Sequence, residues 1–224
     1  EALAIFRHEG RLIALPLLCS AAVIHYNPSL FDEAGVPQPA ADWTWQDLIE
    51  SARALSRPDR NRCGIAVPEC ARLFTAMVRS FGGDIPDTPG ALWDLHSDAA
   101  CRAAALYAEL RSHAVLGTWE QSAAAFLEGR AAILPFGGAL ATSAKHSPPD
   151  WVRVCPMPRG DKRVTWILAE GIGLGRTATN LDLAAAFCHE LVGPASQQAL
   201  FDAGLRTPGL RSVGGATASS DLYH

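Results

Sequence analysis

A carboxylate and a pair of glycines are among the groups in this sequence that could bind a small polar molecule. Glu69 directly follows a short apolar run, residues 64–67, which ends at Pro68 and predicts a buried strand. A carboxylate just past the end of a strand lies where ligands usually meet an α/β sheet. The same residue could instead be an acid at the start of a helix, stabilised by the helix dipole. Both interpretations of Glu69 stay open.

Backbone and aromatic groups could complete such a site. Gly137 and Gly138 follow the apolar run 130–136, and their missing side chains let a ligand or another backbone approach closely. Trp43 lies outside the apolar stripe of the helix predicted after it, so its ring is freer to contact something else. Trp166, within the run 164–169, either offers an aromatic face or packs in a sheet. Together these groups suit a neutral polar solute, which needs a few hydrogen-bonding groups and an apolar platform.

Other chemistries find less support in the residues. The sequence has no G-x-S-x-G nucleophile motif, and His189-Glu190 lacks the second histidine of H-E-x-x-H. The six cysteines form no C-x-x-C pair. We therefore predict no enzyme, no metal site and no cofactor. A glycosidase that uses Glu69 with Glu170 or Asp84 is the remaining catalytic alternative, because two carboxylates across a cleft can cleave a glycosidic bond.

The chain has 224 residues, of which 49% are hydrophobic and 19% are charged, and its net charge is −4. This composition is that of an ordinary globular protein. This charge gives no basic surface for a nucleic-acid partner. No apolar run approaches the roughly 18 residues of a membrane-spanning helix, and residues 1–9 lack the features of a signal peptide. We expect most cysteines to be free, buried thiols, although Cys63 and Cys70 could bridge in an exported protein.

Alternating strands and helices predict an α/β fold with at least part of the sheet parallel. We expect strands over 10–16, 21–26, 64–67, 130–136, 152–155 and 164–169, and helices after the capping residues Thr44, Ser97, Thr118 and Asn180. Residues 17–20 are too few for a crossover and too apolar for an exposed turn. The backbone is therefore predicted to pass there from one packed body into another, as at a hinge.

An ordered set of short motifs resembles the middle signature of bacterial extracellular solute-binding proteins. The set comprises Gly10 to Pro16, Tyr26-Asn27, Leu30-Phe31, Ala34-Gly35 and Thr44-Trp45 with Leu48. The resemblance implies a type II periplasmic-binding-protein-like fold, in which two lobes joined by a hinge close over a solute. It implies one mostly complete lobe over 21–162, a partial lobe from 1–16 and 164–210, and a flexible tail over 211–224. The partial lobe would belong to a fragment or a reduced variant.

The resemblance also implies a function. The chain would be the extracytoplasmic component of an ABC importer, in the periplasm or lipid-anchored at the cell surface, with the transporter's membrane subunits as partners and no membrane span of its own. Its ligand would be a small polar solute such as a sugar or oligosaccharide, and Ser20 would join Glu69 as a hydrogen-bonding contact. A degenerate fragment that binds no ligand is the second alternative.

Overall fold

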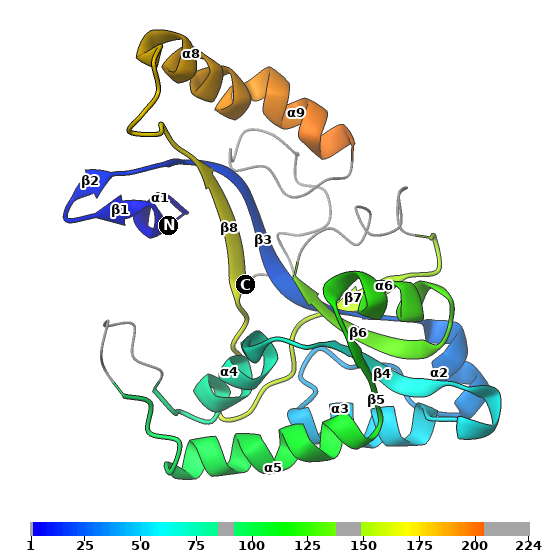
Figure 1. The fold of residues 1–224 in the computed structure, drawn as a ribbon. Helices are drawn as coiled ribbons and strands as arrows, with labels where there is room; N and C mark the ends of the chain where they lie inside the picture. Colours follow the sequence, from blue (N-terminus) through cyan, green and yellow to red (C-terminus); the bar gives the residue numbers. More distant parts are fainter. Residues whose placement is uncertain (1, 85–91, 138–148, 204–224) are drawn as a thin grey trace. The chain divides into compact units, whose positions relative to one another are not determined.

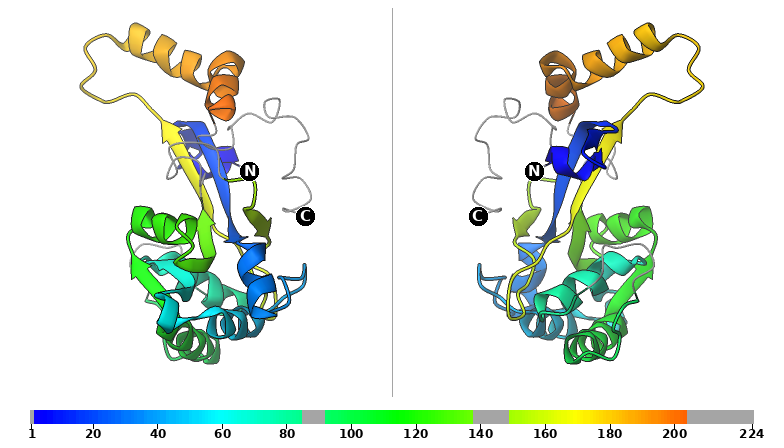
Figure 2. Two further views of the ribbon diagram at one scale, coloured as in Figure 1. Left: turned by 90° about the vertical axis from the view of Figure 1, so that its right-hand side faces the viewer. Right: turned by 90° about the vertical axis from the view of Figure 1, so that its left-hand side faces the viewer.

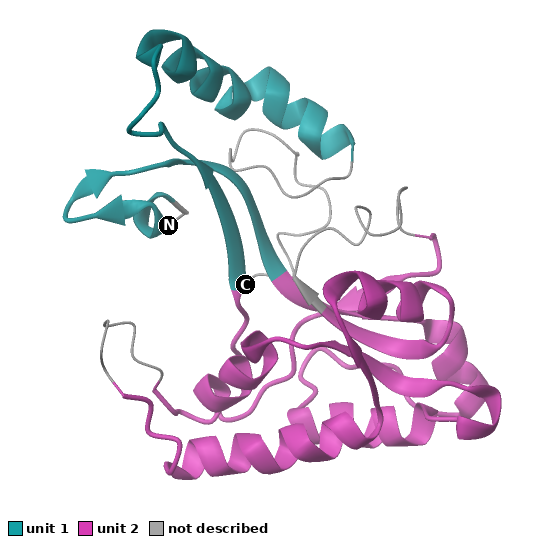
Figure 3. Ribbon diagram, viewed as in Figure 1, with its two compact units in different colours: residues 1–21, 137–147, 167–224 teal, residues 22–136, 148–166 magenta. Residues whose placement is uncertain are grey.

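The computed structural model describes residues 2–84, 92–137 and 149–203. By its internal contacts the chain divides into two units (Figure 3). Unit 1 comprises residues 1–21, 137–147 and 167–224, and unit 2 comprises residues 22–136 and 148–166. The predicted tail over 211–224 lies outside the described residues. Each unit is described by itself.

Figures 1 and 2 show the elements along the chain. In chain order they are α1 (Ala2–Ile5), β1 (Arg7–His8), β2 (Arg11–Leu12), β3 (Leu15–Tyr26), α2 (Pro28–Ala34), α3 (Trp45–Leu55), the 3-10 helix η1 (Pro58–Arg60), β4 (Cys63–Pro68), α4 (Ala71–Ser80), α5 (Asp98–Ser112), β5 (Ala114–Gly117), α6 (Trp119–Leu127), β6 (Ala131–Gly137), β7 (Arg153–Cys155), β8 (Ile167–Ile172), α8 (Leu181–Val192) and α9 (Pro194–Asp202). None of the helices within the described ranges is long and apolar enough to cross a bilayer.

Unit 2 is built on a sheet with strand order β5-β4-β6-β3-β7. Strand β4 runs parallel to both β5 and β6, whereas β7 pairs antiparallel with β3. Helices α3 and α6 each pack against β4, and α5 packs against α3 and α4 (Figure 1). The predicted α/β class with a partly parallel sheet is therefore confirmed.

Local sequence signals explain where the helices of unit 2 begin and end. Thr44 and Asp47 form a capping box at the start of α3, and Thr118 and Gln121 form another at α6. Gly35 ends α2 in the left-handed conformation, with φ of 66°. The apolar residues of α3 are buried as their spacing predicts: Trp45, Leu48, Ile49, Ala52 and Leu55.

Strand β3 corrects the prediction of two strands separated by residues 17–20. The backbone is one continuous strand from Leu15 to Tyr26, in which residues up to Ala21 belong to unit 1 and residues from Ala22 belong to unit 2. Pro16 does not end the strand because the β3–β8 ladder shifts its register between Pro16 and Leu18. Such an irregularity accommodates a residue that has no N–H to donate. The hinge itself remains a prediction.

Other strands also differ from the sequence prediction. β8 begins at Ile167, so Trp166 precedes the strand instead of lying inside it. β5 (Ala114–Gly117) and the β1–β2 hairpin were not predicted. β5 has only four residues and directly follows the fifteen-residue helix α5, so its short apolar run does not stand out from the helix.

The buried core belongs almost entirely to unit 2. Among the described residues, Cys188 is the only buried hydrophobic residue of unit 1, whereas every other one lies between Ala22 and Met157. Unit 1 instead exposes many large apolar side chains: Leu3, Ile5, Leu12, Ile13, Ile167, Leu174, Leu181, Leu183, Phe187 and Phe201. All six tryptophans of the sequence belong to unit 2.

The six cysteines are all free, so Cys63 and Cys70 form no disulfide. Only Cys155 and Cys188 are buried, which corrects the expectation that most would be. Cys101 is exposed because it faces away from the stripe by which α5 packs on its neighbours. Burial raises the pKa of the Cys155 thiol to about 12, although Arg163 acts in the opposite direction.

His25, in the unit 2 part of β3, should make stability depend on pH. Burial, the larger cause, lowers the pKa of its imidazole from 6.5 to about 4, although a hydrogen bond with the backbone of Leu134 acts in the opposite direction. Because the folded-state pKa is the lower one, the unfolded chain binds more protons between these two values. The free energy of unfolding should therefore fall by about 3 kcal/mol as pH drops through this window.

Urea denaturation followed by circular dichroism at several pH values measures this dependence. The His25→Gln variant should lose most of it, whereas the exposed His96 can be replaced with glutamine as a control that keeps it. Equal pH dependence in wild type and His25→Gln would show that the buried imidazole is not its source.

Candidate functional site

The carboxyl ends of two parallel strands meet in unit 2. Pro68 at the end of β4 is opposite Gly117 at the end of β5. The backbone N–H of Glu69 donates to the carbonyl of Gly117 over 2.8 Å, which holds the two ends together. Helices α4 and α6 begin directly after these strands. In α/β sheets this edge is where ligands usually bind.

Five residues of this edge carry suitable side chains: Glu69, Arg72, Arg111, Thr118 and Trp119. We call them the carboxyl-edge site. Glu69 comes from the β4–α4 connection, as the sequence predicts, and its side chain is 58% exposed. Arg111, near the end of α5, lies 4.0 Å from the Glu69 carboxylate. The exposed carboxylate can therefore still accept hydrogen bonds from a ligand.

Arg72 and Trp119 bring a cation and an aromatic ring to the same edge. The guanidinium carbon of Arg72 lies 5.6 Å from the centroid of the Trp119 ring, which is half-buried. Thr118 fixes the start of α6, because its hydroxyl accepts from the Gln121 N–H while the Gln121 side chain accepts from the Thr118 N–H. A carboxylate, a guanidinium and an aromatic ring in one place can bind a small polar molecule.

The sequence did not single out Arg72 or Trp119 as site residues. Trp119 has the spacing of a packing residue, because it lies on one helical face with Ser122 and Phe126. The strand before Trp119 is the signal that could have identified this residue. Once β5 is recognised, Thr118 and Trp119 directly follow the end of a strand, as Glu69 does.

The other predicted aromatic residues lie elsewhere in unit 2. Trp43 is only 4% exposed and donates its indole N–H to the carbonyl of Pro156 over 3.1 Å. The expectation that its ring is free to contact something else is therefore wrong. Trp166 is half-buried and packs against the unit 2 core. Its indole N–H is buried and has no hydrogen-bond partner among the described residues, so its role at a binding site stays a prediction.

Ser20 and Gly137 belong to unit 1, whereas Trp43, Glu69 and Trp166 belong to unit 2. Ser20 is 7% exposed in β3, and its hydroxyl has no hydrogen-bond partner among the described residues. Gly137 ends β6. Gly138 lies outside the described residues. The roles of Ser20 and Gly137 at a binding site stay predictions.

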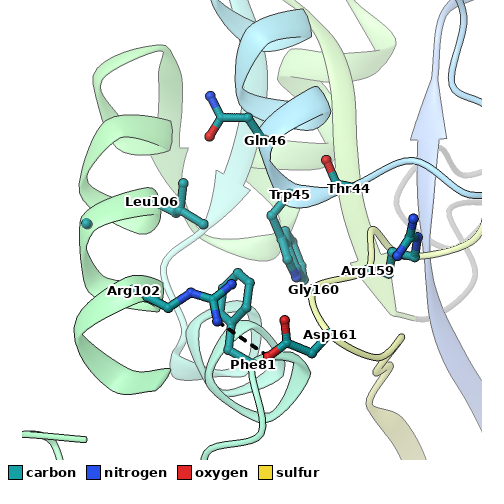
Figure 4. Close-up of a pocket in the computed structure, with 10 residues that line it drawn as sticks. Thr44, Trp45, Gln46, Phe81, Arg102, Leu106, Arg159, Gly160 and Asp161 are labelled. Atoms are coloured by element: carbon teal, nitrogen blue, oxygen red, sulfur yellow. Dashed lines mark hydrogen bonds and ion pairs between the residues drawn. The ribbon is translucent and has the colours of Figure 1, made fainter. Parts of the chain in front are cut away.

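A pocket elsewhere in unit 2 has a volume of about 450 Å³ (Figure 4). Its walls come from the start of α3, from α5 and from the turn at Gly160. The Arg102 guanidinium carbon lies 4.2 Å from the centroid of the Phe81 ring, and Arg102 donates to Asp161 over 3.4 Å. None of the predicted site residues lines this pocket. Within the described ranges, no three His, Cys, Asp or Glu side chains gather to hold a metal ion.

Comparison with known proteins gives one family match. The sequence profile of the bacterial extracellular solute-binding proteins matches residues 2–198. A mannitol-binding protein from Pseudomonas aeruginosa is 39% identical over 59 residues, which is 26% of this chain and 13% of that protein.

Solved structures show the same fold. The ABC substrate-binding protein Lmo0181 from Listeria monocytogenes, in complex with cycloalternan, superposes with a TM-score of 0.84 at 22% identity, over 94% of this chain and 56% of that one. Maltose-bound MalE3 from T. maritima gives a TM-score of 0.81 at 20% identity, over 95% and 58%. A solute-binding protein from Agrobacterium vitis with bound D-mannitol gives 0.76 at 18% identity, over 89% and 52%.

These structures have the type II periplasmic-binding-protein fold, and the fold predicted from the sequence motifs is confirmed. The chain spans little more than half the length of these solved structures.

Proposed function

The chain belongs to the bacterial extracellular solute-binding proteins, and from this premise we propose that it binds a small polar solute, a sugar or polyol, for an ABC importer. The proposal includes a location outside the cytoplasm and the importer's membrane subunits as partners. The carboxyl-edge site is the observation that supports it most directly. The solved relatives support the ligand class, since their structures contain bound cycloalternan, maltose and D-mannitol.

The groups of the carboxyl-edge site fit the recognition of a polyhydroxylated molecule. A carboxylate accepts hydrogen bonds from neighbouring hydroxyl groups, and the Trp119 ring offers an apolar face to the C–H groups of a sugar. Glu69 and Arg72 come from the β4–α4 segment and Trp119 from the start of α6, so two rigid element ends position them. The proposed role of these residues is binding without chemical change.

A thermal-shift screen tests the proposed function. The chain is heated with mannitol, ribitol, maltose and other neutral sugars and polyols, and each solute is recovered and analysed by NMR. A bound solute should raise stability as RT ln(1 + [L]/Kd), about 2.7 kcal/mol at one hundred times Kd, and should be recovered unchanged. Conversion of the solute would instead indicate the glycosidase alternative, and no response to any solute would contradict solute binding.

Replacing Glu69 with glutamine should weaken solute binding about tenfold, because a charged acceptor becomes a neutral amide. Isothermal titration calorimetry measures the affinity. Glu109→Gln is the matched control, since Glu109 is also a glutamate of unit 2 beside an arginine, Arg53, at 3.8 Å. Affinity that falls equally in both variants would count against a direct contact by Glu69.

A further inference from the structure

The Arg72 guanidinium is exposed and donates no hydrogen bond to any described protein acceptor. Other arginines of unit 2 have carboxylate partners: Arg53, Arg60, Arg62, Arg102, Arg111 and Arg130. Within the described part of the chain, the Arg72 guanidinium interacts with the Trp119 ring at 5.6 Å, which restricts its orientation without using its donors. Its N–H groups are therefore available to a ligand.

The nearby carboxylates do not compete for Arg72. Glu69 pairs with Arg111. Glu120 accepts from the Thr118 hydroxyl over 2.8 Å. A hydrogen bond with its own backbone, followed by the one from Thr118, lowers the pKa of Glu120, although desolvation acts in the opposite direction. Both carboxylates of this edge thus have partners of their own.

The backbone around Arg72 adds to the positive field. Arg72 lies in the first turn of α4, and the residue before this helix, Cys70, supplies no side-chain acceptor to the helix N–H groups. The start of a helix carries partial positive charge. The uncapped start of α4 therefore reinforces the charge of the Arg72 guanidinium.

We propose that the solute carries a carboxylate or phosphate group, which Arg72 binds at the carboxyl-edge site. This inference rests on the proposed function and narrows its ligand to an acidic sugar or sugar derivative. A guanidinium presents its donors in a planar fork that matches two oxygens of a carboxylate or phosphate. Charge-assisted hydrogen bonds of this kind are roughly twice as strong as neutral ones. A neutral polyol has no carboxylate or phosphate oxygens with which to form these bonds.

Matched pairs of probes test the inference by calorimetry at low salt. The pairs are glucose with glucuronate, sorbitol with gluconate, and glucose with glucose 6-phosphate. In at least one pair the acidic member should bind at least about tenfold more tightly, and added salt should reduce this ratio because it screens exposed charges. Arg72→Gln should abolish the preference by weakening the acidic member's binding more than the neutral member's, and Arg72→Lys should retain part of the preference, since lysine keeps the charge without the fork.

Arg102→Gln is the matched control, because Arg102 also lies over an aromatic ring of unit 2 but lines the separate pocket. It should leave the acidic preference unchanged. Neutral members that bind as tightly as acidic ones, or a ratio that survives Arg72→Gln, would overturn the inference and leave solute binding intact. If no member of any pair binds, the inference is overturned, and the thermal-shift screen, which contains further sugars and polyols, decides the proposed function separately.

Discussion

Replacing Trp119 with alanine is expected to weaken solute binding about 10- to 100-fold, or about 1.4 to 2.8 kcal/mol. The substitution removes the aromatic face and also the ring that restricts Arg72. Two contributions of the carboxyl-edge site are lost together, so this is the largest effect on binding that we expect from one side chain. Isothermal titration calorimetry with the best solute of the screen measures it.

Two further variants make this result specific. Trp119→Phe keeps an aromatic face and should retain most of the affinity. Trp93→Ala removes another tryptophan of unit 2, one that is 44% exposed and lies outside the site. It should bind as the wild type does. Wild-type affinity in Trp119→Ala, or an equal loss in Trp93→Ala, would show that the carboxyl-edge site does not hold the solute.

Replacing Gly64 with alanine should destabilise unit 2 by about 3 kcal/mol or more. Gly64 lies in β4 where α3 crosses closely: an added Cβ would be 1.8 Å from the carbonyl oxygen of Ala52 and 2.4 Å from its carbonyl carbon. Both are backbone atoms, so no side chain can rotate away and the strand or the helix must move. This is the largest loss of stability that we expect from adding one methyl group.

Urea denaturation followed by circular dichroism measures the change in the free energy of unfolding. Gly175→Ala is the control, because an added Cβ there meets no atom within 4 Å. It should leave the unfolding midpoint near that of the wild type. A Gly64→Ala protein as stable as this control would mean that α3 and β4 are not packed as closely as the structure shows.

The sequence predicted best those features that short-range chemistry determines. The caps at Thr44 and Thr118 need only neighbouring residues, and both are confirmed. Pro16 was misinterpreted because its effect depends on the partner strand: the shifted register opposite β8 tolerates a residue that would otherwise interrupt the ladder.

Dependence on distant segments also limits what the sequence predicts about the candidate site. Glu69 was found because it directly follows a recognisable strand, whereas Trp119 was missed because β5 is too short to recognise without its partner β4. Trp43 was expected to be free because only its own helix was considered. Its indole N–H donates instead to the carbonyl of Pro156, more than one hundred residues away along the chain. Contacts between distant segments thus decide which aromatic residues remain available.

The division of the tryptophans between the units has a practical consequence for spectroscopy. Since all six indoles belong to unit 2, intrinsic emission excited at the tryptophan band reports on that unit alone. Unit 1 contributes no tryptophan emission, so its state can be followed with a label on Cys19, which is only partly buried. A single unfolding transition in this emission therefore describes unit 2, which contains β4 and β5. It gives no information on unit 1.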